Sequence, residues 1–202
     1  RDLAFNPRTN HLLVTDNAGR TIHILDPATG AALGALNNAG IGAATLGLSS
    51  VAVTEDGVIF GAQYNRAPAR IYRWQDESAA PALAFSATLA ENAGRRLDAL
   101  GAGSSTRLAM ASAGSTAAFH WIETSDGVNF SLASTASGGE AGTEYGVYGL
   151  ALWDANLALG KGNTGALFAW RRTGGAGAWE WDANWSPGAD FQTASITQVR
   201  RA

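Results

Sequence analysis

Three aspartates could supply an acidic metal site if the chain builds repeated units around an axis. Asp2, Asp98 and Asp154 each stand within a few residues of a short apolar run. Carboxylates that converge from several units could bind a metal ion and activate water for hydrolysis. When the apolar runs are aligned on their central alanines, Asp2 falls two residues before, Asp98 one before and Asp154 three after. Because a functional ring would use equivalent positions, we interpret the three as turn and cap carboxylates.

The three histidines do not form a metal-binding motif. His11, His23 and His120 are far apart in the sequence, without a His-x-His pair or a His-Glu motif. His23 lies two residues before Leu25 and His120 one before Trp121, which predicts opposite faces of their strands. No metal site and no cofactor are therefore predicted. A Ser-His-Asp triad stays open, since its members need only meet in space, but no Gly-x-Ser-x-Gly elbow occurs.

Glycine-rich and Asp/Asn-rich segments offer weaker candidates. Segments 101–105 and 160–164 are rich in glycine but lack the Gly-Lys-Ser/Thr ending of a phosphate-binding loop. Segments 16–19 and 126–129 could provide oxygen ligands for calcium, but an EF-hand loop needs more ligands and a distal Glu. We interpret all four segments as turns.

The candidate ligand-binding site is aromatic. Trp179, Trp181 and, if the strand continues, Trp185 share one face at a period of two. Exposed, these indoles would form a platform for a glycan or a surface protein. Buried, they would pack between units. Both interpretations remain open, and the platform is the predicted ligand-binding site.

Composition excludes several functional classes. The chain has 202 residues, a net charge of −3 and no cysteine. A binder of nucleic acid would carry a basic face, whereas the arginine pairs 95–96, 171–172 and 200–201 are scattered. No apolar run approaches a membrane span. Without cysteine there is no disulfide framework and no thiolate zinc site.

The candidate residues fall in four similar units of about 48 residues. The aligned positions Leu25, Trp74, Trp121 and Trp170 lie 49, 47 and 49 residues apart. Each unit contains four short apolar runs separated by turn residues. The units are predicted at 1–46, 47–93, 94–146 and 147–188, with an extra strand at 189–200. The run 79–90 could be a short helix, but its alternation favours a strand.

Four strands per period of 40–50 residues are typical of a β-propeller. One four-stranded sheet cannot bury both of its faces, and stacking the sheets around an axis covers them. The sequence therefore predicts an all-β propeller of about four blades. We expect a piece of a larger propeller rather than a closed four-unit ring, because the chain starts inside a strand.

The first unit resembles the YVTN-type propeller repeat. Leu13-Val14-Thr15-Asp16 stands in the place of the Tyr-Val-Thr-Asn strand, and segment 24–30 in the place of the following hairpin. The whole chain is similar to a family of uncharacterised secreted bacterial proteins with a domain of unknown function, through segments 3–7, 71–74 and 124–130. The resemblance implies a propeller fold and a location outside the cell or at the cell surface, and no activity.

Three functions follow as hypotheses. The first is a non-catalytic exported module that binds or scaffolds, with a glycan or surface protein as partner and neither nucleic-acid binding nor membrane insertion. The second is a self-assembling structural subunit, because the chain has low charge and a single lysine while strand edges are usually protected by charge. The third is a hydrolase or lactonase with an axial metal site. We predict the first, a protein that is not an enzyme.

Overall fold

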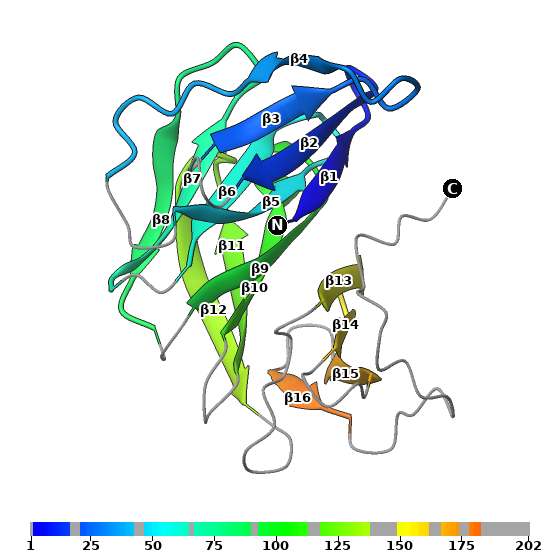
Figure 1. Cartoon of the computed structure of the whole chain (residues 1–202). Coiled ribbons are helices and arrows are strands. Elements are labelled where there is room, and N and C mark those ends of the chain that lie inside the picture. The colour runs from blue at the N-terminus through cyan, green and yellow to red at the C-terminus, as the bar shows by residue number, and fades with distance from the viewer. Residues whose placement is uncertain are drawn as a thin grey trace.

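A computed structural model describes most of the chain as β-structure (Figure 1). It describes residues 2–16, 21–42, 47–64, 67–89, 93–112, 118–137, 149–161, 167–173 and 178–182. Within these residues the strands form four four-stranded sheets. The short 3-10 helix η1 (Gly103–Ser105) joins two strands of the third sheet. Among the described residues, no helix has the length and apolar character needed to span a bilayer.

The strands follow one another in chain order within each sheet, as antiparallel neighbours. The first sheet contains β1 (Leu3–Asn6), β2 (His11–Asp16), β3 (Thr21–Leu25) and β4 (Ala32–Ala35). The second contains β5 (Leu48–Val53), β6 (Ile59–Gln63), β7 (Ala69–Trp74) and β8 (Ala82–Ala87). The third contains β9 (Ala93–Leu100), β10 (Arg107–Ser112), β11 (Ala118–Thr124) and β12 (Phe130–Ser137). The fourth contains β13 (Gly149–Asp154), β14 (Leu157–Lys161), β15 (Leu167–Arg172) and β16 (Trp179–Trp181).

The predicted all-β architecture of four four-stranded units is confirmed. Each sheet falls in its predicted unit, except that β9 begins at Ala93, the last residue of the second predicted unit. The alternating run 79–90 contains strand β8, so the strand interpretation was right. The extra strand predicted at 189–200 lies outside the described residues.

The core lies between successive sheets. Ala4, Leu13 and Ile22 of the first sheet pack against Val51 and Trp74 of the second. Similar apolar clusters join the second sheet to the third and the third to the fourth. Because side chains alternate between the two faces of a strand, a sheet with a neighbour on each side must be apolar on both faces. All six residues of β5 are buried for this reason.

The strand pairing corrects the alignment of the third unit. Leu25 pairs with Leu12, and Trp74 with Ile59, and both belong to the face toward the preceding unit. The equivalent residue of the third sheet is Ile122, which pairs with Leu108 and packs toward the second sheet. Trp121 points the other way, into the cluster shared with the fourth sheet. The equivalent positions 25, 74, 122 and 170 are thus 49, 48 and 48 residues apart.

The innermost strands are the first strand of each sheet. Contacts join β1 to β5, β5 to β9 and β9 to β13. Among the described residues no comparable contact joins β13 back to β1, and Figure 1 shows the two strands apart. The described sheets therefore form an open arc with the first strands on its inner side.

Candidate functional site

The inner strands carry polar side chains that hold neighbouring sheets together. Asp98, on β9, is buried. One carboxylate oxygen accepts a hydrogen bond from the Leu152 N–H of β13 at 2.7 Å, and the other accepts one from the Ala99 N–H at 2.9 Å. An inner strand has an edge without a neighbouring strand, so its amides need acceptors of another kind. Asp98 supplies that acceptor across the interface between the third and fourth sheets.

Asp2 repeats this arrangement between the first two sheets. It directly precedes β1, and its carboxylate accepts a longer hydrogen bond, 3.4 Å, from the Val51 N–H of β5. Burial raises the pKa of the Asp2 carboxyl above its usual range, and the positive charge of Arg96 opposes part of that rise. The Asp2 backbone N–H donates to the Thr15 hydroxyl at 2.7 Å.

Two serines extend these contacts from the second sheet to the third. The hydroxyls of Ser49 and Ser50 both donate to the Gly94 carbonyl, at 2.8 and 3.1 Å. Gly94 has a φ of +91°, and a Cβ there would lie 2.2 Å from the Gln63 carbonyl oxygen. Only glycine allows this close approach of two backbones. We call Asp2, Ser49, Ser50, Gly94 and Asp98 the inner-strand cluster.

The turn-and-cap interpretation was therefore wrong for Asp2 and Asp98. Both are interface acceptors, Asp98 on an inner strand and Asp2 directly before one. Asp154 fits the interpretation, because it is exposed and accepts the Asn156 N–H at 2.7 Å within a turn. The sequence analysis also missed Ser49, Ser50 and Gly94. The one signal for them was a polar pair, Ser49-Ser50, at the start of an otherwise apolar run.

Metal binding needs several ligands at one point. In the part of the chain that the structure describes, no three His, Asp or Glu side chains lie together so as to hold an ion. The acidic groups of the inner strands instead contact backbone N–H groups of the next sheet.

His120 is buried in a hydroxyl network. Its Nε2 lies 2.7 Å from the Ser112 Oγ, and its Nδ1 lies 3.0 Å from the Thr135 Oγ1. Burial lowers the pKa of His120 from 6.5 to about 4, so the ring is neutral at pH 7. The Ser-His contact has the length found in a catalytic dyad, but both residues are buried and a threonine occupies the place of the orienting carboxylate.

The prediction that His23 and His120 face opposite ways was wrong. His23 pairs with Val14, and His120 with Met110, at equivalent rungs of their sheets. The error came from the one-residue misalignment of the third unit. His23 lies 3.7 Å from Asp16, half exposed.

His11 belongs to a different polar contact between the first two sheets. The Glu77 carboxylate, in the turn between β7 and β8, accepts from the Asn6 side chain at 2.9 Å. It also accepts from Thr9 at 2.5 Å and lies 2.8 Å from the His11 Nδ1. This carboxylate joins the end of β1 and the start of β2 to the second sheet. Its three hydrogen-bond partners are not members of the inner-strand cluster.

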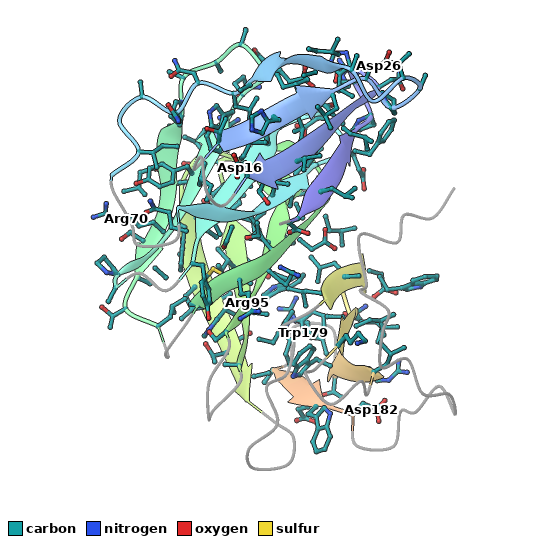
Figure 2. All side chains as sticks on the ribbon, in the orientation of Figure 1. Asp16, Asp26, Arg70, Arg95, Trp179 and Asp182 are labelled. Atoms are coloured by element: carbon teal, nitrogen blue, oxygen red, sulfur yellow. The ribbon has the colours of Figure 1, made fainter. Side chains whose placement is uncertain are left out.

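The tryptophan prediction is corrected for its first member. Trp179 is buried, 4.8 Å from Trp121 and 4.9 Å from Phe119 between ring centroids (Figure 2). Its ring is enclosed between the third and fourth sheets, so it cannot be part of an exposed platform, and the packing interpretation holds. Trp181 is half-buried against the same cluster. Trp185 lies outside the described residues.

Segment 126–129 forms the predicted turn. The Asp126 carboxylate accepts from the backbone N–H groups of Val128 and Asn129, each at 2.8 Å, and from the Asn129 side chain. These hydrogen bonds lower the pKa of Asp126. Segment 101–105 contains the short helix η1. Of segments 16–19 and 160–164, the structure describes only residues 16, 160 and 161, which are the last residues of strands β2 and β14. The rest of these two predicted turns lies outside the described residues.

The fold is similar to those of solved structures. YCF48 from Cyanidioschyzon merolae matches with a TM-score of 0.56 and 12% identity, over 89% of this chain and 58% of that one. Hydrazine synthase of Kuenenia stuttgartiensis matches with a TM-score of 0.50 and 11% identity, over 93% of this chain and 57% of that one. At such low identity the likeness concerns the fold alone. It confirms the β-propeller prediction.

This chain spans somewhat more than half the length of these two structures. No protein-family model and no curated protein matches it.

Proposed function

We propose that the chain is a non-catalytic propeller module that binds or scaffolds a partner. The observation that carries the proposal is that the polar groups of the inner-strand cluster form hydrogen bonds with backbone groups. Asp98 accepts backbone hydrogen bonds from Leu152 and Ala99, and Ser49 and Ser50 donate to Gly94. Groups that could act as acid, base or nucleophile on the inner side of the arc therefore hold sheets in place.

The proposed partner is a glycan or a protein outside the cell. The location rests on the resemblance to YVTN-type repeats of exported bacterial proteins. The aromatic part of the proposed binding surface narrows to Trp181, which is half-buried. It directly precedes Asp182, whose carboxylate forms an ion pair with Arg171 at 2.6 Å. A partly exposed indole next to a charged pair suits a sugar ring, which combines an apolar face with hydroxyl groups.

Glycan and protein binding arrays test this proposal. Wild-type protein is compared with Trp181→Ala, and with Trp153→Ala as a control for an exposed indole elsewhere on the fourth sheet. We expect a ligand whose binding falls at least tenfold in Trp181→Ala and is unchanged in the control. Binding that is indifferent to Trp181→Ala would remove this residue from the site. Fractionation of expressing bacteria tests the export.

An assay panel separates this proposal from the hydrolase alternative. Esterase, lactonase and glycosidase substrates are tested with and without added divalent metal ions. We expect no turnover above background. A metal-dependent activity that is lost in Asp98→Asn, in protein that keeps its circular dichroism spectrum, would contradict the non-catalytic proposal and favour the axial hydrolase.

A further inference from the structure

We draw no further inference here: the strongest candidate, the side-chain cluster of Arg107, Glu123 and Arg172 where the start of β10 meets the ends of β11 and β15, consists of ion pairs between its own members at 3.4 and 3.6 Å that join the third sheet to the fourth, and nothing in the part of the chain that the structure describes points from it to a ligand.

Discussion

The first and second sheets differ in what covers them rather than in their strand pattern. Both pair their strands in the same order, and Leu25 occupies in the first the rung that Trp74 occupies in the second. Trp74 is fully buried, and its indole N–H donates to the Asn37 carbonyl at 2.7 Å. Leu25 is half-buried. The same position is thus core in one sheet and half-buried in the other, because among the described residues only the second sheet has a neighbouring sheet on that side.

The largest loss of stability should come from removing the side chain at this position in the second sheet, where it is buried. Trp74→Ala removes a buried indole and should lower the free energy of unfolding by about 3–5 kcal/mol. Leu25→Ala, at a position that is only half-buried among the described residues, should cost about 1 kcal/mol. Urea unfolding followed by far-ultraviolet circular dichroism measures both. Equal costs would break the comparison, since they would mean that the first sheet is covered as fully as the second.

A second comparison uses two glycines with positive φ. Gly94→Ala would place a Cβ 2.2 Å from the Gln63 carbonyl oxygen, whereas a Cβ at Gly30, φ +71°, meets nothing within 4 Å. Backbone strain of about 1–2 kcal/mol applies to both, and overpacking adds about 1–3 kcal/mol at position 94 alone. Thermal unfolding should therefore show a clearly lower Tm for Gly94→Ala. Similar values would contradict the close approach between the second and third sheets.

The equivalent rung of His23 and His120 provides a pH test. Burial lowers the folded-state pKa of His120 from 6.5 to about 4, so between these values the unfolded state binds more protons. The stability that His120 contributes is therefore present above pH 6.5 and is lost as the pH falls toward 4. The loss should reach roughly 3 kcal/mol.

Urea unfolding of wild type and His120→Asn at several pH values measures this loss. The difference between the two proteins isolates His120 from the other titrating groups. The advantage of wild type should shrink as the pH falls from 7 to 4. A difference that stays constant with pH would show that His120 is not buried as a neutral ring.

The smallest effects concern the carboxylates. Asp98→Ala leaves the Leu152 N–H without its acceptor between the third and fourth sheets and should cost about 1–3 kcal/mol. Asp154→Ala removes an exposed turn acceptor and should cost less than about 1 kcal/mol. Denaturant midpoints of the two variants decide the order. The reverse order would contradict the role of Asp98 as an interface acceptor.

The repeat, its strands and their order could be predicted from the sequence, because short apolar runs and turn residues are local signals. The register of the third unit could not. Trp121 and Ile122 are adjacent and both buried, so a strand with two covered faces shows no alternation to set its phase. A shift of one residue exchanges the two faces, which misplaced both Trp121 and His120.

The candidate site was less predictable than the fold. Asp2 and Asp98 resembled turn carboxylates because hydrogen bonding across an interface leaves no pattern along the chain. The prediction that Trp179 and Trp181 lie on the same face of their strand was right, because side chains two residues apart in a strand share a face. Whether the face was solvent or core depended on the third sheet, which supplies Trp121 and Phe119 from about sixty residues earlier.

The sequence by itself determined the sheets: four strands per unit, four units, turns at Asp, Asn and Gly, and apolar residues on both faces. Tertiary structure alone decided which apolar faces are covered, where the inner-strand amides find acceptors, and that the buried ring of His120 has a lowered pKa. The physical reason is that hydrogen bonding within a strand pair and side-chain alternation are local. Burial depends instead on a neighbouring sheet nearly fifty residues away in the chain.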